Sequence, residues 1–137
     1  MKSFDIKRVI LLRIDRGEEV ISSIVNACER EGIKAALING IGLLSRAKLA
    51  VFVPEKQAYD SFEVDKPMEL ASLMGNVSIK DGRPFVHLHV VLGDKEGSVA
   101  GHLMEGYIGG TGEIAILELK GELRRDLEKD GLTLLNI

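Results

Sequence analysis

The three histidines of the chain lie within a span of sixteen residues, as the alternating pair His87 and His89 and as the more distant His102. Imidazole is the side chain that most often binds metals, and three imidazoles with one open position form the ligand set of a catalytic or exchangeable zinc site. Nickel, iron(II) and cobalt accept the same ligands. The clustering therefore predicts a divalent metal site, with zinc as the first choice.

The segment from Phe85 to Leu92 has the pattern of a strand that would bring two of these imidazoles together. Because side chains alternate between the two faces of a strand, His87 and His89 share one face and lie about 6.5 to 7 Å apart. Both rings can then turn toward one ion. The opposite face carries only apolar side chains and is expected to form core: Val86, Leu88, Val90 and Leu92.

The third imidazole reaches the same site only if the hairpin has the right register. A four-residue loop from Asp94 to Gly97 pairs His89 with His102, and residues paired in this way project to the same side. A loop one residue shorter or longer would set His102 opposite Leu88, on the wrong face, unless a bulge at Gly101 restored the phase. Four-residue loops are common, and Gly97 can take the left-handed conformation that often closes them. The metal hypothesis requires this register.

Two interpretations of the histidines remain open. With a metal, the open coordination position would hold a water whose pKa falls toward about 7, which supports hydrolysis or hydration. Without one, the histidines are structural or interface residues. No general base is identified by the sequence, although Glu105, Glu113 and Glu118 follow His102 in the chain, and alternation from His102 sends Glu105 to the other face.

The remaining pattern predicts an α+β, strand-rich chain that forms one domain over residues 1–137. Apolar residues 7–14 predict a first strand, and Asp15 with Glu18 has the spacing of a capping box for a helix over about residues 17–31, ended by Gly32. We expect a turn at residues 39–42 and a short polar helical turn at residues 122–129. Further strands are predicted at residues 33–38, 45–53, 59–64, 68–79, 85–92, 98–107, 113–119 and 132–137.

Composition limits the partners that the protein can have. The chain of 137 residues has a formal net charge of -3, which gives no general attraction to phosphate backbones. No apolar run reaches the roughly 18 residues that span a bilayer, so we expect no membrane partner. The N-terminal residues lack the apolar core of a secretory signal, and we expect a cytoplasmic location. The single Cys28 is expected to be a buried apolar side chain.

Two polar positions have simple structural interpretations. Asn76, flanked by Gly75 and strand residues, is expected to hydrogen-bond buried backbone instead of a ligand. Arg124 and Arg125 form a small basic spot that is balanced by neighbouring acids, and we expect it on a solvated face.

Several motifs together resemble one known family over nearly the whole chain. The most specific are residues 84–93, Pro-Phe-Val-His-Leu-His-Val-Val-Leu-Gly, and residues 97–106, Gly-Ser-Val-Ala-Gly-His-Leu-Met-Glu-Gly. Residues 16–19, 40–47 and 72–78 add to the match. The chain is identified as a member of the plants-and-prokaryotes conserved (PPC) domain family, also called the PD1-like DNA-binding family. It departs from the family pattern at Ala100, where a glycine is usual.

The resemblance implies an α+β fold with a largely antiparallel β-sheet and one main helix packed on it, assembled as a homotrimer. Similar prokaryotic members carry the same three histidines and are suspected metal binders, which maps the metal ligands onto His87, His89 and His102. The leading hypothesis is thus a cytoplasmic, trimeric, metal-binding protein with a metal-dependent hydrolytic or small-molecule function and a small-molecule ligand at the metal. A DNA-binding or regulatory module is the alternative, disfavoured by the acidic charge. A structural oligomer that acts as a protein-interaction platform is the third.

Overall fold

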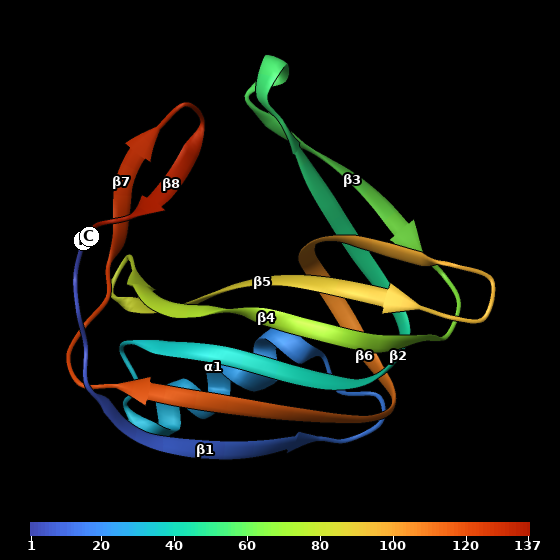
Figure 1. Cartoon of the computed structure of the whole chain (residues 1–137), viewed down its shortest axis with the longest axis horizontal. Coiled ribbons are helices and arrows are strands. Elements are labelled where there is room, and N and C mark those ends of the chain that lie inside the picture. The colour runs from blue at the N-terminus through green and yellow to red at the C-terminus, as the bar shows by residue number, and fades with distance from the viewer.

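A six-stranded sheet and one helix make up most of the molecule, which a computed structural model describes over residues 1–137 (Figure 1). Every strand pairing between named strands is antiparallel, which confirms the predicted α+β class and sheet type. In chain order, the elements are β1 (Ile6–Ile14), α1 (Val20–Glu31), β2 (Ala36–Val53), the 3-10 turn η1 (Pro54–Lys56), β3 (Ala58–Val64), β4 (Met68–Lys80), β5 (Arg83–Gly93), β6 (Ser98–Leu119), β7 (Arg125–Lys129) and β8 (Leu132–Leu135).

Two strands are much longer than the sequence pattern predicted. The strands expected at residues 33–38 and 45–53 are one strand, β2, and those expected at 98–107 and 113–119 are one strand, β6. The turn expected at residues 39–42 is therefore wrong. Its glycines instead let β2 and β6 approach closely, since a Cβ on Gly42 would lie 3.0 Å from Cα of Gly112 and nearer still to the Thr111 carbonyl.

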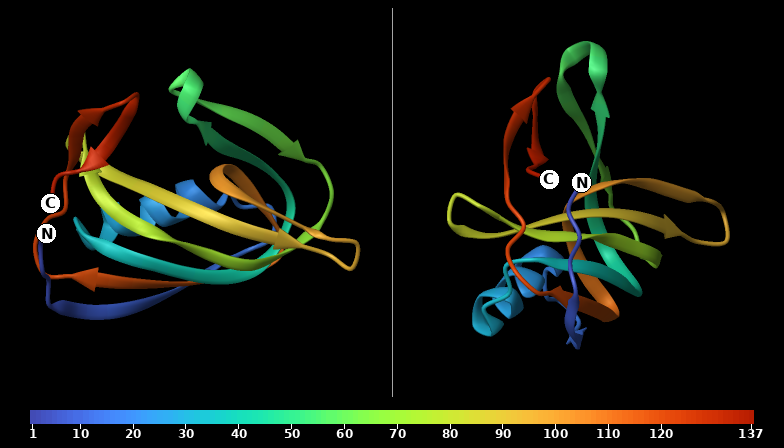
Figure 2. Two further views of the ribbon diagram at one scale, coloured as in Figure 1. Left: turned by 45° about the horizontal axis from the view of Figure 1, so that its top comes forward. Right: turned by 60° about the vertical axis from the view of Figure 1, so that its left-hand side comes forward.

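The long strands let the sheet close on itself. The strand order is β1-β6-β5-β4-β2-β3, and β2 pairs with β6 as well as with β4. Strands β6, β5, β4 and β2 thus form a closed circuit, and Figure 2 shows how they curve around the core. Helix α1 packs on the inner face against β1, β5 and β6. Four residues of the helix are buried there: Val20, Ile24, Ala27 and Cys28.

The helix begins three residues later than predicted because a different carboxylate caps it. Glu19 is the N-cap residue, and its side chain accepts hydrogen bonds from two N–H groups of the first turn and from the N–H of Gly106 on β6. Only half of the predicted capping box forms, since Glu18 accepts from the Asp15 N–H while the Asp15 carboxylate pairs with Arg13. The cap therefore also fixes the helix to the sheet.

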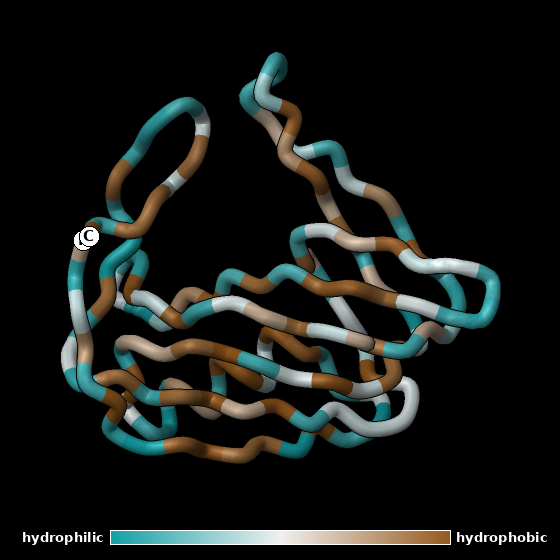
Figure 3. The backbone as a smooth tube through the Cα atoms, viewed as in Figure 1, coloured by the Kyte–Doolittle hydropathy of each residue, from teal (hydrophilic) through white to brown (hydrophobic).

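The outer face of the sheet has no helix on it and exposes apolar side chains. Figure 3 shows hydrophobic segments along strands β1, β6 and β2, whose side chains alternate between the two faces. Residues facing the helix are buried, whereas the exposed large hydrophobic residues of β1, β2 and β4 are Ile6, Val9, Leu11, Leu37, Ile41, Val51 and Met74. The only helix, α1, is too short to cross a membrane.

In the small separate hairpin β7–β8, strand β7 replaces the helical turn predicted at residues 122–129, while β8 lies within the strand predicted at residues 132–137. Asp130 and Gly131 have φ values of 51° and 77°, as a two-residue type I′ hairpin turn requires. The hairpin rises on the same side of the sheet as the arm formed by the ends of β2 and β3 (Figures 1 and 2). The two meet at their tips, where a Cβ on Gly131 would lie 2.7 Å from the carbonyl oxygen of Gln57.

Candidate metal centre

The hairpin between β5 and β6 has the register that the histidine hypothesis required. His89 lies directly opposite His102, across a loop of residues 94–97. The loop closes without a left-handed glycine, because Gly97 does not have a positive φ. Instead, the Asp94 carboxylate accepts hydrogen bonds from the N–H groups of Glu96 and Gly97 at 2.8 and 3.1 Å. An aspartate turn thus sets the register.

The three imidazole rings converge on one space on the outer face of the sheet. Ring centroids are 5.1 Å apart for His87 and His89, 4.9 Å for His87 and His102, and 5.5 Å for His89 and His102. One nitrogen from each ring lies within 4.8 Å of the others. Tetrahedral zinc at its usual bond lengths holds nitrogens about 3.3 Å apart, so the imidazole nitrogens would have to move closer together to bind one ion. On the opposite face, Leu88 and its neighbours are buried as predicted.

The surroundings keep two of these imidazoles in the neutral form that binds metals. The pKa of His87 is lowered to about 4, first because the ring is buried and then because of the positive charge of Arg125 and the nearby histidines. The pKa of His102 is also lowered, by burial and then by His89 and Arg125. Nδ1 of His102 is buried without a hydrogen-bond partner. An unsatisfied buried nitrogen of this kind fits a metal ligand.

Arg125 is the site residue that the sequence pattern missed. It was expected on a solvated face, but only Arg124 lies there, whereas Arg125 is 7% exposed. Nη2 of Arg125 donates to Oδ1 of Asn76 at 3.2 Å and lies 3.3 Å from Nδ1 of His87. Asn76 therefore orients a charged side chain, where a bond to buried backbone was predicted. Nε of Arg125 is buried and has no hydrogen-bond partner.

A cavity of about 250 Å³ joins Arg125 to His87 and His102. It lies between the floor of the sheet, the end of the β3 arm and hairpin β7–β8, and none of its lining residues is acidic. The candidate bases Glu105, Glu113 and Glu118 do not line it either. The lining residues are Tyr59, Lys80, Phe85, His87, His102, Arg125, Gly131, Leu132, Thr133 and Leu134.

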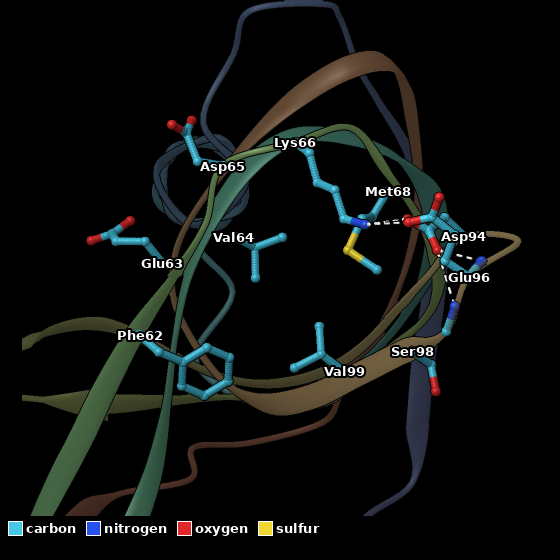
Figure 4. A pocket seen from close by; sticks show the side chains of 11 residues that line it. Phe62, Glu63, Val64, Asp65, Lys66, Met68, Asp94, Glu96, Ser98 and Val99 are labelled. Carbon is cyan, nitrogen blue, oxygen red and sulfur yellow. Dashed lines mark hydrogen bonds and ion pairs between the residues drawn. The ribbon is translucent and has the colours of Figure 1, made fainter.

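A larger cavity, of about 580 Å³, lies at the other end of the sheet and contains no histidine (Figure 4). The side chains of Phe62, Val64 and Val99 point into it, and Lys66 at its edge forms an ion pair of 2.6 Å with Asp94. Its other charged lining residues are the carboxylates Glu63, Asp65 and Glu96, and it brings no cluster of imidazoles together as the histidine site does.

The chain also resembles known proteins. A family model described as the Plants and Prokaryotes Conserved (PCC) domain matches residues 1–120. The chain belongs to this family. The plant- and prokaryote-conserved (PPC) protein of Pyrococcus horikoshii is 45% identical, with a TM-score of 0.94 over 100% of this chain and 96% of that one. Among curated proteins, none matches the chain.

Two further PPC-like structures carry functional descriptions. A metal-containing protein from Archaeoglobus fulgidus is 38% identical, with a TM-score of 0.92 over 98% of each chain. A candidate DNA-binding protein from Bacteroides thetaiotaomicron is 27% identical, with a TM-score of 0.86 over 96% of this chain and 94% of that one. The family resemblance inferred from the sequence is confirmed. One of these two relatives is described as containing a metal and the other as a candidate DNA-binding protein.

Proposed function

We propose that the protein binds a divalent metal ion, zinc first, through His87, His89 and His102. The observation that carries this proposal is the convergence of three imidazoles on one space, one of them with a buried nitrogen that has no other partner. Three neutral nitrogen ligands leave an open position on zinc. The 38% identical relative described as metal-containing supports the same conclusion.

The bound ion would supply an activated water or polarise a bound oxygen, which makes a hydrolytic or small-molecule reaction the activity we propose. The residues of the chain prepare the site for this chemistry. Burial and Arg125 keep His87 unprotonated, and the Tyr59 ring packs against His102 with centroids 5.1 Å apart, which limits rotation of the imidazole. Hairpin β7–β8 covers one side of the cavity and reduces access of bulk water.

Elemental analysis of protein purified without a nickel column tests the metal proposal. The wild-type protein should hold close to one equivalent of metal per chain, and a His87→Ala/His102→Ala variant should hold almost none. Lys95→Ala, in the exposed loop of the same hairpin, is the control and should keep its metal. Equal metal content in the wild-type protein and the double histidine variant would contradict the proposal.

We propose in addition that the protein is a homotrimer assembled through the outer face of the sheet. That face exposes Leu11 at 82%, Val9 at 57% and Met74 at 58%, more apolar surface than scattered single residues provide. Met74 pairs with His89 across β4 and β5, so the apolar surface adjoins the metal site. The cytoplasmic location stays a prediction from the N-terminal sequence.

DNA binding is the second candidate function, and the relative from Bacteroides thetaiotaomicron is the observation in its favour. Against it stands the charge balance, because 21 acidic residues outnumber 18 basic ones. The cationic side chains around the histidines line a cavity of about 250 Å³, which is too small to admit a duplex backbone. We therefore rank metal binding above DNA binding.

A further inference from the structure

We propose that the cavity beside the histidines binds a small organic carboxylate, held at one end by Arg125 and at the other by the metal ion. The role of Arg125 in holding the carboxylate is argued from the structure of this chain alone, whereas the role of the metal ion rests on the function proposed above. The proposal therefore names a substrate or ligand class for the same site.

The first argument is the uncompensated charge of Arg125. Its side chain is buried, yet none of the ion pairs of the molecule includes it. Its partners are all neutral: the Thr133 carbonyl at 3.0 Å, the Asn76 amide and the His87 ring. A buried cation without an anion is costly, and a ligand anion would offset that cost.

Metal binding increases the demand for an anion. In the metal-free protein, Nδ1 of His87 can accept a hydrogen bond from Arg125. If His87 binds the metal through Nδ1, that lone pair is used, and if it binds through Nε2, Nδ1 carries a proton and becomes a donor. In both cases Arg125 loses this acceptor, and the ion adds positive charge to the same cavity.

No acidic side chain in the cavity supplies this negative charge. Lys80, also in the lining, adds a second positive charge, and its ammonium donates to the Thr133 hydroxyl at 3.2 Å. One acid contacts the Thr133 hydroxyl: the exposed Glu128, whose carboxylate accepts a hydrogen bond from it at 2.6 Å. The cavity therefore presents cationic groups at its base and nothing to neutralise them.

The shape and lining of the cavity favour an organic carboxylate over an inorganic anion. The planar guanidinium fork of Arg125 matches the two oxygens of a carboxylate. Phe85, Leu132 and Leu134 give the cavity apolar walls that would contact a short hydrocarbon body. Its volume of about 250 Å³ lies below the 300 Å³ or more of sites for drug-sized ligands, so the ligand is small.

Calorimetric titration with three probes tests the proposal: butyrate, the neutral isostere butyramide, and inorganic phosphate. Each is titrated into metal-free protein and into protein loaded with zinc. Butyrate should bind both forms at least tenfold more tightly than either other probe, and zinc should tighten its binding further. Binding of butyramide or phosphate as tight as that of butyrate would overturn the assignment of the ligand class.

Variants at adjacent arginines identify the group that holds the carboxylate. Arg125→Met should weaken butyrate binding about 10- to 100-fold in both forms, as expected for loss of charge-assisted hydrogen bonds. The control Arg124→Met removes a neighbouring charge that is exposed and paired with Glu122, and it should leave binding unchanged. Equal binding by wild-type protein and a folded Arg125→Met variant would overturn the role of Arg125.

Two further measurements keep the outcomes distinct. If Arg125→Met fails to fold, the Nε–Hε resonance of Arg125 in the wild-type protein provides the readout, and it should shift with butyrate but not with butyramide. No shift would overturn the proposal. If the histidine variants show that no metal is bound, yet metal-free protein binds butyrate through Arg125, the metal proposal fails while the anion site stands. If metal is bound but butyrate is not, the metal proposal stands and the anion-site proposal fails.

Discussion

Nη2 of Arg125 and Nδ1 of His87 lie 3.3 Å apart, although the two residues are 38 positions apart in the chain. This contact joins hairpin β7–β8 to strand β5, the strand that carries two of the three imidazoles. The guanidinium charge also helps to lower the pKa of His87. Packing of the hairpin and protonation of the histidine are therefore coupled.

Lowering the pH should destabilise the metal-free protein through His87. Its pKa is lowered to about 4 in the folded chain, so the unfolded chain binds the proton first as the pH falls. This contribution to stability is complete above the unfolded pKa of about 6.5 and is lost between that value and 4. Between pH 7 and pH 5, urea titrations should show a decrease in the free energy of unfolding of about 2 kcal/mol from this residue.

The matched variant for this prediction is His87→Gln, which keeps a polar side chain but cannot titrate. Its loss of stability between pH 7 and pH 5 should be smaller than that of the wild-type protein by about the same 2 kcal/mol. Parallel pH profiles for the two proteins would show that His87 is not the group responsible.

Gly75→Ala should destabilise the fold and weaken metal binding. An added Cβ would overlap the carbonyl oxygen of His87 and lie 3.0 Å from Cα of Leu88, so strands β4 and β5 would have to separate beside the histidines. We expect a loss of about 1 to 3 kcal/mol in the free energy of unfolding, as for other overpacked sites. Chemical denaturation measures the first effect and zinc titration the second.

Gly93→Ala is the control, because it lies at the end of the same strand and an added Cβ would meet nothing closer than 3.7 Å. It should change the free energy of unfolding by less than about 1 kcal/mol. A Gly75→Ala protein as stable as Gly93→Ala would contradict the close approach of the two strands.

Leu11→Glu should dissociate the proposed homotrimer. Leu11 is 82% exposed on the outer face of the sheet, and a carboxylate there would be desolvated in an interface. Light scattering after size exclusion should give three times the chain mass of 15.0 kDa for the wild-type protein and a lower mass for the variant. Lys56→Glu, on the exposed turn η1, should remain a trimer. A wild-type mass of one chain would refute the assembly.

DNA should not bind measurably at physiological salt. With a net charge of -3, the chain has few cations available to displace counterions from a duplex. A gel-shift titration with an arbitrary duplex at about 50 mM and 200 mM salt should show no complex at either concentration. A complex at low salt that weakens steeply at high salt would support the DNA-binding candidate instead.

The histidine hairpin could be predicted because the information for it is local. Alternation places His87 and His89 on one face, and the length of a single loop decides where His102 lies. The long strands β2 and β6 could not be predicted in the same way. Their glycines, such as Gly42, are typical of turns in isolation, and they are tolerated here only because a second backbone lies against them.

Arg125 could not be recognised because its burial comes from residues far away in the sequence. Segment 122–129 is mostly charged and resembles a solvated surface, whereas the burial of Arg125 depends on contacts with residues distant in the sequence, such as Asn76 and His87. A signal for the hairpin was present, however, since the pair Asp130-Gly131 is typical of a type I′ turn. Together with the strand predicted at residues 132–137, which matches β8, that turn indicates a hairpin whose other strand is β7.

The match to the family model ends at residue 120, before the hairpin that carries Arg125 and roofs the cavity. The three imidazoles lie within the matched residues, whereas Arg125 and the hairpin wall of the cavity lie beyond them. Substitutions in the hairpin can therefore change the wall of the cavity and leave the three histidine positions untouched.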